Sequence, residues 1–188
     1  PDKIRFCMDA RACANGTCLN HHVIGEMEQL VPMQQPCRDF RDPLYACTFD
    51  IKGFFHRVLV NVPDREVFRF FFFGDRSMTT TQLFRWSAHI FGAASSPTVT
   101  AFVLRHHADR IESMFEEYVI NTIKRRFYVD DGSGGKNTPE EYRKYVADMQ
   151  TSMALGGFEL TKWKYSHPTL LGEPPVKKGE ELTKFLGL

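Results

Sequence analysis

Three aspartates carry the clearest chemical signal in this sequence, and two of them are adjacent. Asp130 and Asp131 follow the aromatic and β-branched run Phe127 to Val129 and precede the glycine-rich stretch Gly132 to Gly135. The pattern predicts a strand that ends in a tight turn with both acids at its tip. Adjacent side chains of a strand point to opposite faces, whereas a turn lets both carboxylates reach one ligand. A divalent cation bound there would offset the repulsion between them.

A third acid extends this signal. Asp50 ends a β-type run that begins at Leu44. Carboxylates at two strand ends are the minimum for a site that holds two Mg²⁺ ions about 3.5–4 Å apart, with substrate phosphates and water at the other positions. For Asp130 and Asp131 alone, the alternative is a solvated hairpin turn without a ligand, because Asp-Asp-Gly is common turn chemistry.

Strand-like and helix-like segments must position these acids. The β-type runs 67–73 and 79–86 flank the turn residues Gly74 to Ser77, which predicts a hairpin. Small residues precede Pro97, which is suited to the first turn of a helix. The apolar stripe that follows predicts a helix extending to about Tyr118.

A second helix is predicted after the acids. Thr138 is a suitable N-cap, Pro139 suits the first helical position, and Glu141 completes a capping box. Its apolar stripe is expected to be core and consists of Tyr142, Tyr145, Val146, Met149 and Met153. Short strands are expected at 158–160 and 165–171. The mixture of helices and antiparallel hairpins predicts an α+β fold.

Composition limits the class of protein. The length of 188 residues fits one domain, or one domain with a small lobe, and the 43% hydrophobic and 25% charged content is typical of soluble globular proteins. A net charge of +1 leaves nucleic-acid binding to local patches such as Lys124 to Arg126, whose alternative is a charged strand edge. No apolar run approaches the roughly 20 residues of a membrane helix, so no membrane partner is expected. The ends at Pro1 and Leu188 suggest a piece of a longer chain.

The cysteines favour a reducing environment. Five cysteines are an odd number, and without a signal peptide they predict reduced, intracellular thiols. Cys13, Cys18 and His21 resemble part of a zinc site. The standard spacings and a clear fourth ligand are missing, so the sequence does not favour zinc.

Taken in order, five motifs resemble the palm of reverse transcriptases, and they are similar to those of the Bel/Pao group of LTR retrotransposons. The motifs are Phe49 to Phe55, Phe91 to Pro97, Phe127 to Asp131, Gly156 to Trp163 and Phe185 to Leu188. Arg5 to Ala10, followed by Asn15 to Asn20, is similar to that group's fingers motif. The resemblance implies a right-hand palm, an antiparallel sheet with helices on one face. Residues 1–43 would be partial fingers, 44–66 palm, 67–96 a fingers-side hairpin and loop, and 97–188 palm ending at the primer grip.

The resemblance also implies roles for single residues. Asp50 and Asp130 would be metal ligands, with Asp131 the accessory one. Lys162 would be the general acid for the pyrophosphate leaving group, with Lys164 as its rival. The nucleotide-binding residues would be Arg5 at the triphosphate, Phe55 as the gate against a ribose 2′-OH, and the loop residues Phe91 and Gly92. The primer grip would comprise Phe185, Leu186 and Gly187. For Phe55, the alternative is an ordinary core position.

The implied activity is RNA-directed DNA polymerisation, the transfer of dNMP to a primer 3′-OH with two Mg²⁺ ions, or Mn²⁺ in their place. The implied partners are an RNA or DNA template with its primer, dNTPs, and the thumb and ribonuclease H of a Pol polyprotein. The implied location is the cytoplasm, within virus-like particles. Without a thumb, the isolated chain is expected to be weak or inactive.

Two residue patterns depart from the family, and the second keeps a rival function open. Phe91 stands where many reverse transcriptases have Gln, which is compatible with the Bel/Pao group. Gly132 to Gly135 occupies the expected returning strand of the acidic hairpin, and glycine is poor strand material. The rival is a decayed or domesticated palm that acts as a non-catalytic nucleic-acid-binding or interaction module. A viral RNA-dependent RNA polymerase palm is disfavoured, because an aromatic gate at Phe55 suits dNTPs.

Overall fold

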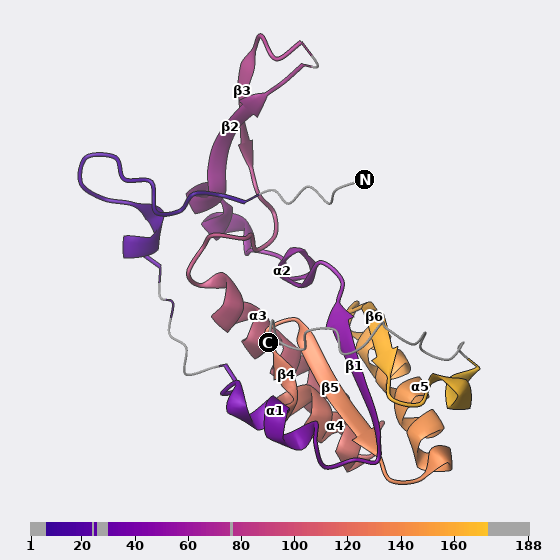
Figure 1. Ribbon diagram of the computed structural model, residues 1–188. Helices are drawn as coiled ribbons and strands as arrows, with labels where there is room; N and C mark the ends of the chain where they lie inside the picture. Colours follow the sequence, from indigo (N-terminus) through magenta and orange to yellow (C-terminus); the bar gives the residue numbers. More distant parts are fainter. Residues whose placement is uncertain (1–6, 24, 26–29, 76, 173–188) are drawn as a thin grey trace. The chain divides into compact units, whose positions relative to one another are not determined.

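The computed structural model describes residues 7–23, 25, 30–75 and 77–172 (Figure 1). The chain divides into two compact units: unit 1 comprises Pro1–Glu26 and Phe55–Thr100, and unit 2 comprises Met27–Phe54 and Ala101–Leu188. The predicted nucleotide-binding residue Arg5 and the predicted primer grip, Phe185, Leu186 and Gly187, lie outside the described residues.

Unit 2 is built on a four-stranded antiparallel sheet in the order β4-β5-β1-β6 (Figure 1). Its strands are β1 (Tyr45–Ile51), β4 (Phe127–Tyr128), β5 (Asp131–Lys136) and β6 (Leu160–Tyr165). The helices are α1 (Gln34–Asp39), α3 (Ser96–Arg110, which begins in unit 1), α4 (Glu117–Arg125) and α5 (Pro139–Leu155), with the 3₁₀ turn η4 (Pro168–Leu171) at the end. Helix α5 packs on β5 and β6, and α4 packs on α5 and β4. The predicted α+β class is confirmed.

Helix α5 shows how local sequence signals build this unit. The Thr138 hydroxyl accepts a hydrogen bond from the Glu141 backbone N–H at 3.3 Å, which confirms the predicted N-cap. The same hydroxyl donates to the Glu141 carboxylate at 2.9 Å, so that carboxylate bonds the Thr138 side chain. All five residues of the predicted apolar stripe are buried. The Tyr142 hydroxyl donates to the Ala46 carbonyl on β1 at 2.9 Å, so the helix is joined to the sheet by a buried hydrogen bond as well as by packing.

The glycine-rich stretch is a strand of this sheet, and close packing requires all three of its glycines. A Cβ at Gly132 would lie 2.2 Å from the Phe49 ring, and one at Gly134 would lie 1.8 Å from the hydroxyl of fully buried Tyr145. At Gly135, a Cβ would meet the Tyr45 carbonyl oxygen at 2.1 Å. Side chains here would displace the sheet or its helix, so close packing explains these glycines.

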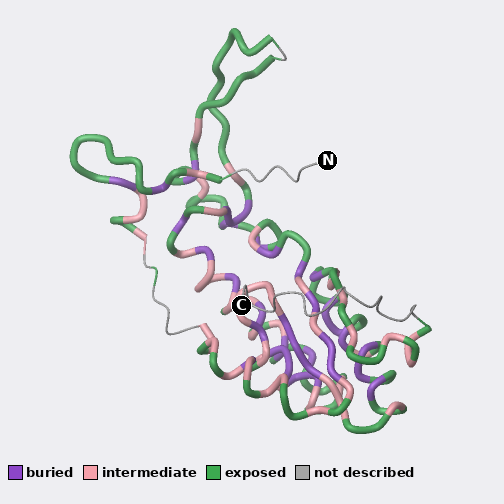
Figure 2. Tube along the Cα trace, viewed as in Figure 1, coloured by how far each residue is buried: buried purple, intermediate pink, exposed green. Residues whose placement is uncertain are grey.

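Unit 1 has its own small core and a projecting hairpin. Its elements are η1 (Leu19–His21), α2 (Phe54–Arg57, which begins in unit 2), η3 (Val62–Phe68), β2 (Arg69–Phe73) and β3 (Thr81–Arg85). Val60, Phe68, Ile90 and Ala93 are buried together, and Met8, Leu19 and Trp86 pack against them. The β2–β3 hairpin confirms the prediction, but every residue of β3 is exposed (Figure 2). Among the described residues, no helix has both the length and the apolar character needed to cross a membrane.

The structure corrects several predicted elements of unit 2. The long helix predicted from Pro97 ends at Arg110, and its continuation is the separate helix α4. The two short strands predicted near the end of the chain are one strand, β6, followed by η4. Alternation along β6, where Lys162 and Lys164 are exposed and their neighbours half-buried, was the signal for a strand there.

The basic patch at the end of α4 is also different from its prediction. Lys124 lies in the last turn of the helix, not on a strand edge, and its ammonium contacts Asp109 at 2.7 Å. The Arg126 guanidinium lies 3.7 Å from the Asp39 carboxylate. Basic residues at a helix C-terminus are favoured by the helix dipole, and these two charges are partly neutralised within unit 2.

Candidate active site

Two of the three aspartates are direct cross-strand neighbours. Asp50 on β1 is in register with Asp131 on β5, and the Ile51 N–H donates to the Asp130 carbonyl at 2.9 Å. This bonding pattern makes Asp50 and Asp131 a non-hydrogen-bonded pair, the closer of the two antiparallel pairings, with both side chains on one face of the sheet. Two like charges in such a pair are destabilising unless something neutralises them.

The third aspartate lies at the tip of the β4–β5 hairpin. Tyr128 pairs with Asp131, so the loop consists of Val129 and Asp130. Only the first of these two has a positive φ, +56°, which is the pattern of a type II′ turn. Glycine usually occupies that position, and a β-branched residue there is strained by about 1–3 kcal/mol. The predicted turn therefore lies one residue earlier than expected, and Asp131 already belongs to a strand.

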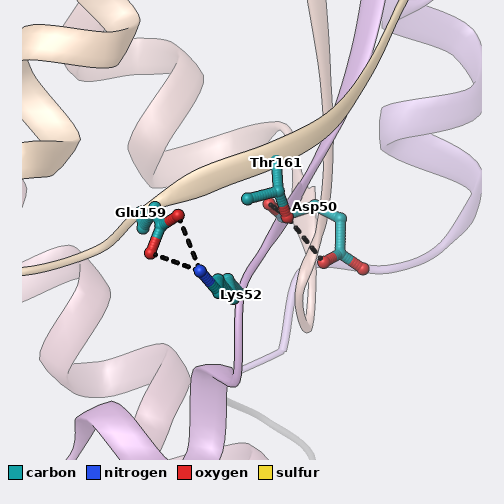
Figure 3. A network of polar contacts seen from close by, with 4 residues as sticks. All are labelled: Asp50, Lys52, Glu159 and Thr161. Atoms are coloured by element: carbon teal, nitrogen blue, oxygen red, sulfur yellow. Dashed lines mark hydrogen bonds and ion pairs between the residues drawn. The ribbon is translucent and has the colours of Figure 1, made fainter. Parts of the chain in front are cut away.

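A β-bulge on the other side of β1 turns a lysine toward the acids. Thr48 is paired with Lys164 and Asp50 with Thr161, so β6 has one extra residue between these pairs. Lys162 lies in the bulge with a φ of +52°, and its ammonium donates to Asp50 Oδ1 at 2.5 Å. The Thr161 hydroxyl is 3.5 Å from Asp50 Oδ2 (Figure 3). The Asp50 carboxylate, 14% exposed, thus has a positive charge beside it.

An ion pair at the edge of the same region was missed by sequence reasoning. The Lys52 ammonium donates to both carboxylate oxygens of Glu159, at 2.9 and 3.1 Å (Figure 3). The Lys52 N–H also donates to the Glu159 carbonyl at 2.9 Å. Both side chains are exposed, so the pair contributes about 1 kcal/mol or less. It joins the end of β1 to the start of β6. The two residues are 107 positions apart, so no local sequence pattern predicts the contact.

The acids perturb one another electrostatically. Burial raises the pKa of Asp131 above its usual value, and the charges of Asp130 and Asp50 raise it further, while Lys162 and Lys164 oppose the shift. Carboxylate oxygens are the ligands that Mg²⁺ and Mn²⁺ prefer, so the donor set fits a divalent cation.

The aspartates are not drawn together in this structure. Within the described part of the chain, the ligand atoms of Asp50, Asp130 and Asp131 do not all lie within 4.8 Å of one another. Asp50 is in contact with the Lys162 ammonium instead. A cation that bound all three would have to compete with Lys162 for Asp50.

The predicted nucleotide-binding residues Phe55, Phe91 and Gly92 lie in unit 1. The Phe55 and Phe91 rings meet edge-on with centroids 4.9 Å apart, and both are half-buried. The neighbouring Phe54 is buried, whereas Phe55 is only half-buried and is not a core residue. Gly92 has a φ of +105°, and a Cβ there would lie 1.9 Å from the Met8 carbonyl oxygen. Only glycine allows this close approach of two backbone segments.

Asn20 holds the loop that contains these residues, a role that sequence reasoning did not assign. Its side-chain amide donates to the Gly92 carbonyl at 3.0 Å and accepts from the Ala94 N–H at 2.8 Å. The Met8 N–H donates to the Phe91 carbonyl at 3.0 Å. The polar side chain at the end of the Asn15 to Asn20 motif was the only signal, since its partners are more than 70 residues away.

Comparison with solved structures identifies the fold. The chain matches a structure of the foamy viral protease-reverse transcriptase, in a form designated dRH, in complex with double-stranded DNA. The TM-score is 0.61 and the sequence identity is 17%, and the match covers 84% of this chain and 24% of that one. The foamy viral protease-reverse transcriptase in complex with an RNA/DNA hybrid matches with a TM-score of 0.53, 17% identity, and coverage of 71% and 16%. The chain thus spans less than a quarter of those proteins. No protein-family model and no curated protein matches it. The described residues have a reverse transcriptase-like fold.

Proposed function

We propose that this chain is the palm and part of the fingers of a Bel/Pao-type reverse transcriptase, which transfers dNMP to a primer 3′-OH on an RNA or DNA template. The observation that carries the proposal is the cross-strand pair of Asp50 and Asp131 with Asp130 in the adjoining turn. Two like charges on directly paired strands, with a third in the adjoining turn, contribute no stability, which points to a functional reason for the three acids. The foamy viral neighbours, whose structures contain DNA or an RNA/DNA hybrid, support nucleic-acid partners.

The acids would hold divalent metal. Asp50 and Asp131 offer carboxylates from adjacent strands, Asp130 offers a third from the turn, and Thr161 and Lys162 flank Asp50. When bound, Mg²⁺ would supply charge neutralisation for the triphosphate and would activate the primer hydroxyl. The protein's own contribution is positioning: the acids sit on paired strands backed by α5, so their spacing is set by the sheet.

Two further side chains have roles in this proposal. Lys162 carries an exposed ammonium at the acids and is the proton donor for the pyrophosphate leaving group. Phe55, half-buried against Phe91, excludes a ribose 2′-OH by a steric clash. The palm would comprise 44–66 and 97–188 and the fingers 1–43 and 67–96, with the thumb and ribonuclease H supplied by the rest of a Pol polyprotein.

The non-catalytic alternative has lost its main support. Its argument was the glycine-rich strand, and the packing of Gly132, Gly134 and Gly135 explains those residues without any decay. Any remaining test must therefore address metal binding and catalysis directly.

Single-nucleotide addition to a labelled RNA–DNA primer–template provides that test. The 188-residue chain is used in excess over primer at low ionic strength, because a net charge of +1 predicts weak, salt-sensitive binding. In Asp130→Asn, the rate of addition with Mg²⁺ should fall at least about 1,000-fold, equivalent to about 4 kcal/mol of transition-state stabilisation. Asp42→Asn, the same change at an exposed aspartate before β1, should retain the wild-type rate.

Mn²⁺ binding, followed by paramagnetic broadening of backbone amide signals, provides the second readout. Signals of β1 and the β4–β5 hairpin should broaden in the wild type and much less in Asp50→Asn. Normal addition by Asp130→Asn would refute the metal assignment. A wild-type chain whose β1 and β4–β5 signals do not broaden with Mn²⁺ would contradict the metal assignment and favour the non-catalytic alternative.

A further inference from the structure

The hairpin before η1 places two thiols side by side. Ala14 and Thr17 exchange both backbone hydrogen bonds, at 2.8 and 3.1 Å, around Asn15 and Gly16. These two central residues have φ values of +52° and +79°, the pattern of a type I′ turn. The residues that flank the Ala14–Thr17 pair, Cys13 and Cys18, therefore face each other in the closer, non-hydrogen-bonded geometry.

A short 3₁₀ turn adds an imidazole to the thiols. The His21 N–H donates to the Cys18 carbonyl at 3.1 Å, within η1 and its N-cap. Side chains three residues apart on a 3₁₀ turn lie one above the other, so His21 stands over Cys18. The two Sγ atoms and an imidazole nitrogen all lie within 4.8 Å of one another, and this is the only such group of three in the described part of the chain.

The donor set and its dimensions suit one metal class. Two free thiols and an imidazole are the ligands that Zn²⁺ prefers over Mg²⁺ or Ca²⁺. In a tetrahedral site, Zn–S bonds of about 2.3 Å and Zn–N bonds of about 2.0–2.1 Å place ligand atoms about 3.5–4 Å apart. The trio needs to contract by only about 1 Å to reach that geometry.

We propose that Cys13, Cys18 and His21 bind one Zn²⁺ ion, with a water molecule as the fourth ligand. Cys18 is buried against the core of unit 1, while Cys13 and His21 are exposed, so the fourth position faces solvent. The hairpin turn and the 3₁₀ turn bring the three side chains together despite their unusual spacing in the sequence. Cys-x₄-Cys lies within the range seen in structural zinc sites, and the 3₁₀ turn brings in the third ligand.

This ion would stabilise the loop that holds the predicted nucleotide-binding residues. Asn20 lies between Cys18 and His21, its N–H donates to the Ala10 carbonyl at 3.0 Å, and its side chain bonds the backbone at Gly92. Bound zinc would therefore restrict the motion of the segment that carries Asn20. The site itself involves none of the aspartates, so it stands or falls independently of the polymerase proposal.

Cobalt titration of the reduced, chelator-treated 188-residue chain tests the site without any activity assay. The wild type should bind one Co²⁺ with the intense d–d absorption of a tetrahedral site and with thiolate-to-cobalt charge transfer, and Zn²⁺ should displace it. Cys13→Ser and His21→Ala change exposed residues and should fold. Each should lose metal affinity by about 100-fold or more. Cys7→Ser, an exposed cysteine of the same unit outside the trio, is the matched control and should keep wild-type affinity.

Zinc measured by elemental analysis after purification without added metal gives a second readout, with about one ion per wild-type chain and a small fraction of that in Cys13→Ser. A reduced wild-type chain that gives no tetrahedral cobalt spectrum would overturn the proposal. So would unchanged affinity in both variants, or a Cys13–Cys18 disulfide as the form isolated under reducing conditions. Circular dichroism of each variant shows that a loss of metal is not a loss of fold.

Discussion

Two antiparallel strand pairs in this molecule differ in how far their side chains are buried. In unit 2, β1 pairs with the glycine-rich strand β5, and every residue of both strands is buried or half-buried (Figure 2). In unit 1, the β2–β3 hairpin exposes large apolar side chains, with Phe71 74% exposed and Leu83 55% exposed. The first pair is backed by α5, while a two-stranded hairpin has little to bury against. Asp50 and Asp131 lie on the pair that a helix backs, and Asp130 lies in the turn beside it, so packing helps to fix the spacing of the acids.

The largest difference in stability between the two strand pairs is expected from glycine substitutions. Gly135→Ala in β5 forces a Cβ against the Tyr45 carbonyl oxygen, and backbone cannot move aside, so we expect about 3 kcal/mol of destabilisation. Gly74→Ala at the end of the hairpin meets only the Gln82 side chain, which is exposed and flexible. This control should remain within about 0.5 kcal/mol of the wild type.

Denaturant unfolding can assign that loss to a unit, because the chain has one tryptophan in each: Trp86 in unit 1 and Trp163 in unit 2. Fluorescence of a Trp86→Phe background reports on unit 2, which contains Gly135, and that of a Trp163→Phe background reports on unit 1, which contains Gly74. Equal shifts of the two midpoints, each measured in the unit that carries the glycine substitution, would contradict the contrast between the pairs.

Removing a charge from the acid cluster should have a smaller, stabilising effect. The pKa of Asp131 is raised in the folded chain, so its ionisation opposes folding as pH rises through that pKa. Asp131→Asn should therefore be more stable than the wild type at pH 7, and the advantage should disappear below the usual pKa of aspartate, about 4. Because Asp131 is half-exposed, the gain should be below about 1 kcal/mol. Urea midpoints across this pH range, with Asp42→Asn as the control, measure it. A destabilised Asp131→Asn at pH 7 would contradict the repulsion.

The smallest effect is expected at the hairpin tip. Hydrogen bonds from Thr80 and Thr79 hold the pKa of Asp75 below its usual value. Stability from these bonds is present above the usual pKa and is lost only as the pH falls through the lowered one. Asp75→Asn should speed amide exchange at Thr79 while leaving the unfolding midpoint unchanged. Asp64→Asn in η3 is the control. Unchanged exchange at Thr79 would show that the bonds do not order the tip.

Elements with local signals were predicted well from the sequence, and the relations between elements were not. The N-cap of α5, its apolar stripe and the β2–β3 hairpin depend on contacts within a few residues. The division between α3 and α4 has no proline or glycine to mark it, and it was missed. Helix α1 was not among the elements predicted from the sequence. Pro36 lies in the first turn, where its missing N–H has no intrahelical acceptor.

By itself, the sequence determined the chemical inventory of this protein: three acids at strand ends, a lysine-bearing motif, and two cysteines near a histidine. Only the tertiary structure decided which groups meet. The register of β1 and β5 made Asp131 the partner of Asp50, and a bulge turned Lys162 toward that aspartate across 112 residues. Turns and helix caps depend on near neighbours and can be read from one segment. Strand register depends on a distant partner and on what fits between them, so it exists only in the folded chain.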